Sequence, residues 1–212
     1  MIFATVAVGD RYIDSVNQHE KFFRNNNFDV HVLTDKKNKF SKFFTTYQYD
    51  KLVWSYFDKL LFAITLVKNT GSDVFFCDGD EIDKISSNFT TNFKGGNFIL
   101  TKGEWETTTP NWSDIKYKGK YWKPFRKFLK KQNINPYFCP AYREQHIYFP
   151  ADMDTYSLLY SLEMVKPVLE YSSIIEQSGY SGIGSGEGAG LGYAIIKNNL
   201  KIDFFDPSYF IS

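Results

Sequence analysis

Short apolar runs alternate along this chain with longer stretches in which apolar residues recur every three or four positions. The runs Ile2 to Val8, Asp29 to Thr34 and Val74 to Cys77 are rich in β-branched and aromatic residues, as are strands buried in a parallel sheet. Between the last two runs, the stretch from Phe57 to Val67 places its apolar residues on one stripe, which predicts an amphipathic helix. This alternation of strand and helix predicts an α/β fold.

Residues that favour helix ends and turns set the expected boundaries. We expect Asp14 to cap a helix that ends at Asn25–Asn27, and Ser55-x-x-Asp58 to form a capping box before a second helix that ends near Gly71. Farther along, the pattern predicts strands at Asn97–Thr101, Tyr142–Phe149 and Lys201–Phe205, and helices at Thr155–Ile175, interrupted by Pro167, and at Leu191–Asn198. No repeat or linker divides these elements, so we expect one domain with a mixed, mostly parallel central sheet flanked by helices.

Composition fits a single cytoplasmic domain. A chain of 212 residues is long enough to bury a substantial core. Its formal net charge of +1 produces no long-range electrostatic attraction to nucleic acid or to a membrane. The two cysteines, Cys77 and Cys139, are too few for a disulfide framework and indicate a reducing compartment. The first residues read as a strand rather than a charged leader, and no apolar stretch is long enough for a transmembrane segment.

An Asp-Gly-Asp sequence follows the buried run that ends at Cys77. Asp78 and Asp80 therefore stand at the carboxyl end of a predicted strand, where open α/β sheets bind their ligands. Two carboxylates at such an edge can share a hard divalent cation, which in turn binds a diphosphate. The alternative is a polar turn without chemistry, because Asp and Gly are common turn residues.

A glycine-rich stretch from Gly182 to Gly192 surrounds a single acid, Glu187. It matches neither the phosphate-loop pattern nor the dinucleotide-binding fingerprint. Glycines allow the backbone to approach a ligand closely, so a carboxylate held here can face a reacting carbon. The alternative is a flexible surface loop with a solvated glutamate.

Several other side chains are site candidates with an ordinary structural alternative. Lys59 lies at the edge of the apolar helix stripe and can reach a phosphate, or it is simply solvated. His146 is a candidate for acceptor binding, or a structural histidine. Trp105 and Trp112 offer stacking surfaces for sugar rings, or anchor an irregular segment to the domain. Between Lys116 and Lys131 there are eight basic residues and no acidic one, which suits either a weak peripheral membrane contact, an acidic acceptor or solvent.

The order of these pieces resembles a GT-A glycosyltransferase, and more narrowly glycosyltransferase family 6, the blood-group A/B and α-1,3-galactosyltransferase type. Four segments carry the resemblance: the strand and turn Val6–Ile13, the strand end Val32–Asp35, the Asp-x-Asp strand Phe75–Asp80, and the closing helix and strand from Glu187 to Tyr209. The resemblance implies a single Rossmann-like GT-A domain, with residues 1–102 as the nucleotide-binding half and residues 103–212 as the acceptor-binding half.

The resemblance also implies roles for individual residues. The family's catalytic glutamate corresponds to Glu187, and a basic helix residue near the phosphates corresponds to Lys59. The implied donor-binding residues are Val6, Ala7, Val8, Tyr12, Lys59, Asp78, Gly79 and Asp80, of which Asp78 and Asp80 also bind the metal. The family usually has His-Asp directly before its glutamate, whereas this chain has Ser185-Gly186, so the identity of the acceptor stays open.

The activity that the resemblance implies is the transfer of a hexose or N-acetylhexosamine from a UDP-sugar to a carbohydrate acceptor, with retention of anomeric configuration. Mn²⁺, or Mg²⁺ in its place, is the expected cofactor. A bacterial or viral form in the cytoplasm is the natural comparison, because nothing here resembles the membrane anchor of animal members. Two alternatives remain: a sugar nucleotidyltransferase, and a non-catalytic carbohydrate-binding protein that keeps the fold.

Overall fold

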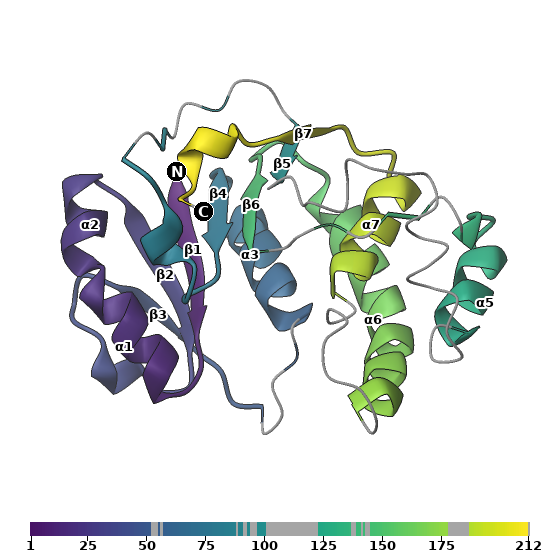
Figure 1. Ribbon diagram of the computed structural model, residues 1–212, viewed down its shortest axis with the longest axis horizontal. Coiled ribbons are helices and arrows are strands. Elements are labelled where there is room, and N and C mark those ends of the chain that lie inside the picture. Colours follow the sequence, from purple (N-terminus) through teal and green to yellow (C-terminus); the bar gives the residue numbers. More distant parts are fainter. Residues whose placement is uncertain are drawn as a thin grey trace.

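Seven strands of the described residues form one sheet at the centre of the molecule, with helices packed on both of its faces (Figure 1). The computed structural model describes residues 1–51, 55, 57–87, 89–90, 93, 97–100, 123–136, 139–140, 142, 145–177 and 187–211. The strands are β1 (Ile2–Ala7), β2 (Asp29–Thr34), β3 (Thr45–Gln48), β4 (Val74–Cys77), β5 (Phe98–Leu100), β6 (His146–Phe149) and β7 (Ile202–Phe204). The expected α/β class is therefore confirmed.

The sheet is mixed and mostly parallel, as expected. Its strand order is β3-β2-β1-β4-β6-β5-β7. Strand β6 runs antiparallel to both of its neighbours, whereas the other four pairings are parallel. The chain runs outward from β1 through β2 to β3 and then returns to place β4 on the other side of β1. The strand order thus reverses between β1 and β4, and this reversal marks the place where open α/β sheets bind ligands.

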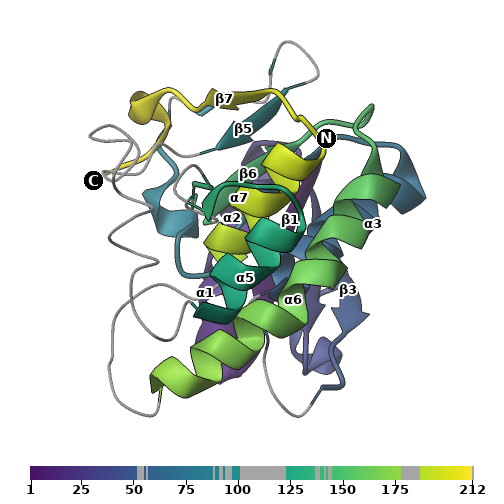
Figure 2. The ribbon, with the colours of Figure 1, turned by 90° about the vertical axis from the view of Figure 1, so that its right-hand side faces the viewer.

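Helices cover the two faces of the sheet unequally. They are α1 (Asp10–Gln18), α2 (Glu20–Asn25), α3 (Phe57–Thr70), α5 (Lys123–Lys131), α6 (Thr155–Gln177) and α7 (Glu187–Lys197), with short 3₁₀ turns at η1 (Lys37–Lys39), η2 (Ile82–Lys84) and η5 (Pro207–Tyr209). One core joins the sheet to α3, α5, α6 and α7, and a second joins it to α1 and α2. Figure 2 shows the first group gathered on one side of the sheet.

The side chains of β1 explain the two cores. Ile2, Ala4 and Val6 belong to the core under α3, whereas Phe3 and Ala7 belong to the core under α1. Because successive side chains of a strand point to opposite faces, a run of apolar residues fills both cores at once. Phe3 contacts the rings of three phenylalanines in the second core, at centroid distances of 4.8 to 5.4 Å.

Several expected boundaries are wrong. The first helix begins at Asp10, after Gly9, so Asp14 lies inside α1 and does not cap it. Gly9 has a φ of 89°, which suits a residue without a Cβ and fixes the turn between β1 and α1. Pro167 lies inside α6 without ending it. The strand β3 has no counterpart among the expected strands.

Candidate functional site

A cavity of about 430 Å³ opens at the carboxyl ends of β1 and β4. Three parts of the chain line it: the end of β1 with the start of α1, the first turn of α3, and the turn after β4. The lining residues are Val6, Val8, Tyr12, Lys59, Asp78, Gly79 and Asp80. This volume lies within the usual range for small-molecule sites, which is about 300 to 1,000 Å³. All seven are residues that the sequence resemblance singles out for donor binding.

Strand pairing places the Asp-Gly-Asp turn beside the end of β1. Ala4 of β1 pairs with Phe76 of β4 in parallel register, so Asp78, two residues farther on, comes level with Val6. The backbone N–H of Asp78 donates a 2.9 Å hydrogen bond to the carbonyl oxygen of Gln145, at the start of the neighbouring strand. Strands on both sides therefore fix the point at which the chain leaves the sheet.

Gly79 leaves no room for a side chain. A Cβ added at this position would lie 2.8 Å from the carbonyl oxygen of Val6 and 3.3 Å from Cγ2 of Val16. The hydroxyl of Ser15 donates a 2.7 Å hydrogen bond to the carbonyl oxygen of Gly79. The contact with Val6 and the hydrogen bond from Ser15 thus hold the turn against β1 and α1. Glycine is required at position 79 because a Cβ would collide with the carbonyl oxygen of Val6. Ser15 was not among the expected site residues, and its type alone gives no signal.

Lys59 and Asp78 form an ion pair at the edge of the cavity. The Lys59 ammonium lies 2.8 Å from Oδ2 and 3.2 Å from Oδ1 of Asp78. The Lys59 side chain is only 4% exposed and the Asp78 side chain 21%. The interpretation of Lys59 as a solvated lysine is therefore wrong. A buried charge of this kind needs a partner, and the carboxylate of Asp78 supplies it.

Asp80 is the second carboxylate of the cavity, and it is exposed. The part of the chain that the structure describes contains no group of three or more His, Cys, Asp and Glu side chains that could hold a metal ion. Asp78 and Asp80 supply hard oxygen ligands for Mn²⁺ or Mg²⁺, but only as part of a coordination set. The two residues fit such a cation when phosphate oxygens and water complete the set.

The start of α1 contributes an aromatic side chain to the cavity rim, and the end of β1 contributes a buried alanine. Tyr12 is 37% exposed at the cavity, and the Arg11 guanidinium lies 5.9 Å from the centroid of its ring. Ala7 is fully buried in the core under α1 and is not among the lining residues. Asp35, at the end of β2, accepts a 3.0 Å hydrogen bond from the N–H of Gly9. This bond holds the turn that presents Tyr12.

The second half of the glycine-rich stretch is helical. Glu187 is the first residue of α7, so the expected loop from Gly182 to Gly192 is wrong over its last six residues. Residues 182–186 and the Glu187 side chain lie outside the described part. A Cβ at Gly190 would lie 2.5 Å from the ring of Phe57, and one at Gly192 would lie 1.9 Å from the carbonyl oxygen of Pro140. These two glycines permit close packing, and the first brings the start of α7 against the start of α3.

His146 occupies a core position near the cavity. Its ring lies 4.1 Å from the ring of Phe210 and 6.4 Å from that of Phe75, measured between centroids. It pairs in register with Cys77, one residue before Asp78, but it is not among the residues that line the cavity. Trp105 and Trp112 lie outside the described residues. The described lining of the cavity thus consists of expected donor residues and does not include His146.

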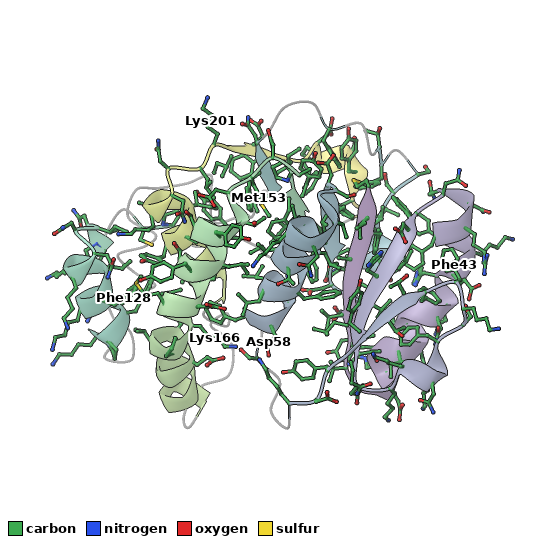
Figure 3. All side chains as sticks on the ribbon, turned by 180° about the vertical axis from the view of Figure 1, so that it is seen from behind. Phe43, Asp58, Phe128, Met153, Lys166 and Lys201 are labelled. Carbon is green, nitrogen blue, oxygen red and sulfur yellow. The ribbon has the colours of Figure 1, made fainter. Side chains whose placement is uncertain are left out.

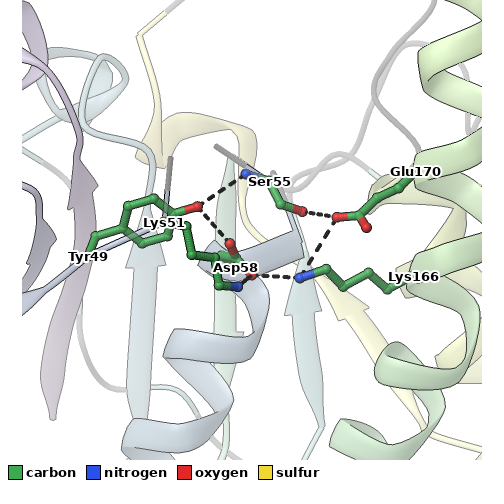
Figure 4. Close-up of polar contacts among 6 residues, drawn as sticks. All are labelled: Tyr49, Lys51, Ser55, Asp58, Lys166 and Glu170. Carbon is green, nitrogen blue, oxygen red and sulfur yellow. Dashed lines mark hydrogen bonds and ion pairs between the residues drawn. The ribbon is translucent and has the colours of Figure 1, made fainter. Parts of the chain in front are cut away.

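A polar network ties the first turn of α3 to α6. The carboxylate of Asp58 accepts hydrogen bonds from Tyr49 at 2.8 Å, Lys51 at 2.7 Å and Lys166 at 2.8 Å (Figure 4). Seen from behind, Asp58 and Lys166 face each other between the two helices (Figure 3). The hydroxyl of Ser55 donates to Glu170 on α6. The expected capping box between Ser55 and Asp58 is therefore wrong, because the N–H of Asp58 donates to the carbonyl oxygen of Ser55 and both side chains bond to other residues.

Burial and the hydrogen bonds of this network shift the pKa of Asp58 and that of Tyr49. Burial raises the pKa of Asp58, but hydrogen bonds from Lys166, Lys51 and Tyr49 outweigh burial and hold that pKa below its ordinary value. Burial, together with the hydrogen bond to Asp58, raises the pKa of Tyr49 to about 12. The carboxylate is therefore charged and the phenol neutral at physiological pH. This network was missed from the sequence, because Lys166 is distant from Asp58 along the chain.

Helix α5 presents a basic surface. Phe125 and Leu129 are buried, while Lys123, Lys127 and Lys130 are exposed. Its apolar side is thus used inside the molecule rather than offered to a lipid phase. No described helix is long and apolar enough to cross a membrane. The weak peripheral contact stays a prediction.

No protein-family model matches the chain, and no curated protein matches it.

Proposed function

We propose that this protein is a metal-dependent glycosyltransferase of the GT-A type that transfers a hexose or N-acetylhexosamine from a UDP-sugar to a sugar hydroxyl. One observation carries the proposal: two carboxylates and a buried lysine meet in a cavity at the point where the strand order reverses. Such a site suits a ligand with a diphosphate group. The ammonium, together with a divalent cation bound by the two carboxylates, can neutralise the diphosphate charge. The resemblance to glycosyltransferase family 6 supports the same function.

The donor would lie across the ends of β1 and β4. Tyr12 and the backbone near Val8 suit the base and ribose, because both residues line the cavity beside the end of β1. Lys59, Asp78 and Asp80 suit the diphosphate. Gly79 lets the backbone of the turn remain against β1, which keeps both flanking carboxylates at the cavity.

The chemistry would take place where the sugar leaves the diphosphate. The C1–O bond to the diphosphate would break with its electron pair staying on the diphosphate, the acceptor oxygen would bond to C1, and the proton of the acceptor hydroxyl would pass to a diphosphate oxygen. A bound Mn²⁺ or Mg²⁺ supplies Lewis-acid stabilisation of the leaving charge. Glu187, at the start of α7 beside the start of α3, would stabilise the positive charge that develops at C1, as carboxylates do in sugar chemistry.

The acceptor side of the proposal rests on residues 103–212. Trp105 and Trp112 are the proposed acceptor contacts, whereas His146 is buried in the core and does not line the cavity. Cys77 and Cys139 are buried free thiols whose pKa is raised by burial, and this fits our proposal that the protein acts in the cytoplasm.

A panel of nucleotide sugars, each incubated with the protein with and without Mn²⁺, tests this function. We expect free UDP to be released from one UDP-sugar only when Mn²⁺ is present, and the release to be lost in Asp80→Asn. Incorporation of labelled pyrophosphate into UTP, with release of the sugar 1-phosphate, would instead identify a nucleotidyltransferase. If a sugar-coated array retained the protein while no donor was consumed, the non-catalytic alternative would replace the proposal.

A further inference from the structure

The ammonium of Lys59 occupies the side of Asp78 that a metal ion would use. It contacts both carboxylate oxygens, at 2.8 and 3.2 Å, and it is almost fully buried. A divalent cation at these oxygens would face this ammonium at contact distance, and the two positive charges would repel each other strongly. Asp78 therefore cannot serve both cations well at the same time unless a further negative charge enters the site.

We propose that Lys59 holds Asp78 in the ligand-free protein and transfers to the donor diphosphate when the divalent cation and the donor bind together. This inference rests on the proposed function. The diphosphate supplies the negative charge that the two cations require. Lys59 then acts as an internal counterion that keeps the site from collecting metal without its substrate.

The surrounding structure confines this transfer to the lysine side chain. Asp58, the preceding residue, is bound to Tyr49, Lys51 and Lys166 and therefore anchors the first turn of α3. The tight contact between Phe57 and Gly190 anchors the same turn from α7. Because the helix is held from two sides, Lys59 can change partner only by rotating its flexible four-carbon side chain. The ammonium lies at the cavity wall, so a diphosphate in the cavity lies within its reach.

This arrangement makes the binding of metal and diphosphate strongly cooperative. Metal alone must displace Lys59 from Asp78, whereas metal with diphosphate gives Lys59 a new partner. By linkage, the factor by which diphosphate strengthens metal binding equals the factor by which metal strengthens diphosphate binding. Lys59 should therefore weaken the binding of free metal and strengthen the binding of the metal–nucleotide complex.

Replacement of Lys59 by methionine tests these opposite effects. We expect Lys59→Met to bind Mn²⁺ alone at least about tenfold more tightly than the wild type, since a unit positive charge at contact distance is removed. The same variant should bind UDP in the presence of Mn²⁺ at least about tenfold more weakly. Lys68→Met is the matched control, because Lys68 is an exposed lysine of the same helix that contacts Tyr156 instead of the cavity. Calorimetry on the folded full chain measures all three proteins.

The outcomes separate the two proposals. If the wild type binds UDP only with Mn²⁺ and Lys59→Met binds Mn²⁺ no more tightly, the transfer is refuted while the proposed function stands. If the wild type shows no metal-dependent UDP binding, both fail. Should Lys59→Met not fold, nitrogen NMR of the lysine ammonium groups in the wild type decides. The Lys59 signal must shift on adding Mg²⁺ with UDP and stay unchanged with Mg²⁺ alone, and any other pattern overturns the transfer.

Discussion

The Asp58 network offers the sharpest test of how the site is held in place. Replacing Asp58 by asparagine keeps the size of the side chain but removes its charge. The carboxylate is only 6% exposed, and its partner Lys166 is 19% exposed. Hydrogen bonds to a buried charged group contribute about 1.5–3 kcal/mol each, which applies to Tyr49 and Lys166. Lys51 is 57% exposed, and a partner exposed to that degree adds only about 0–1 kcal/mol.

These contributions predict that Asp58→Asn lowers the free energy of unfolding by about 3 kcal/mol, because the amide oxygen still accepts one bond. For a chain of this length the melting temperature then falls by about 6–12 °C. The pKa of Asp58 is lowered in the folded state, so its stabilisation is present above its ordinary value of 3.8 and is lost as pH falls through the folded-state pKa. The difference between variant and wild type should therefore be full at pH 7 and shrink below about pH 4.

Thermal unfolding at several pH values measures both effects, with Asp10→Asn as the control. Asp10 also accepts hydrogen bonds from two lysines, Lys36 at 2.8 Å and Lys39 at 2.6 Å, but its side chain is 56% exposed. Its removal should change the melting temperature far less than Asp58→Asn does. Equal melting temperatures for the two variants at pH 7 would refute the reasoning, because burial would then contribute nothing to the network.

Three further predictions concern the proposed donor-binding and catalytic residues. Manganese should strengthen UDP binding several-fold by calorimetry, and Asp80→Asn should abolish that gain; equal UDP affinity in chelator and in manganese would contradict a shared cation. Tyr12→Ala should weaken UDP binding while circular dichroism stays unchanged, and unaltered affinity would exclude Tyr12 from the base pocket. Glu187→Gln should lower turnover by about two or more orders of magnitude, the scale of losing one electrostatic stabiliser, with UDP affinity almost unchanged. Near-normal turnover would remove Glu187 from the chemistry.

The apolar runs predicted the buried strands well because each run must fill two cores at once. Strand β3 was missed because it lies at the edge of the sheet, where Thr45–Gln48 is partly exposed and carries no apolar run. The start of α7 was missed for a different reason. Glycines at alternate positions suggest a loop, whereas here Gly190 and Gly192 are needed by neighbours that are distant in the sequence.

The candidate site likewise contains some residues that the sequence predicts and others that it does not. The carboxylates of Asp78 and Asp80 were predictable because a residue that follows a parallel strand lies at the carboxyl edge of the sheet. The burial of Lys59 was not, because it depends on how elements far along the chain pack against α3. The positions of Ser15 and Lys166 also depend on tertiary contacts, which leave no periodic signal in the sequence.

The cavity has a consequence for how this chain can diversify. Among the described residues, those that line it all belong to the first 80 positions. In the described structure, the later chain meets the first turn of α3 through Lys166 and Gly190. A recombinant that exchanged the sequence after Asp80 would therefore keep these lining residues, provided that it brought a strand beside β4, a cation to Asp58 and no side chain against Phe57. In the proposed reaction, drift or gene exchange can then vary the acceptor while selection holds the donor constant.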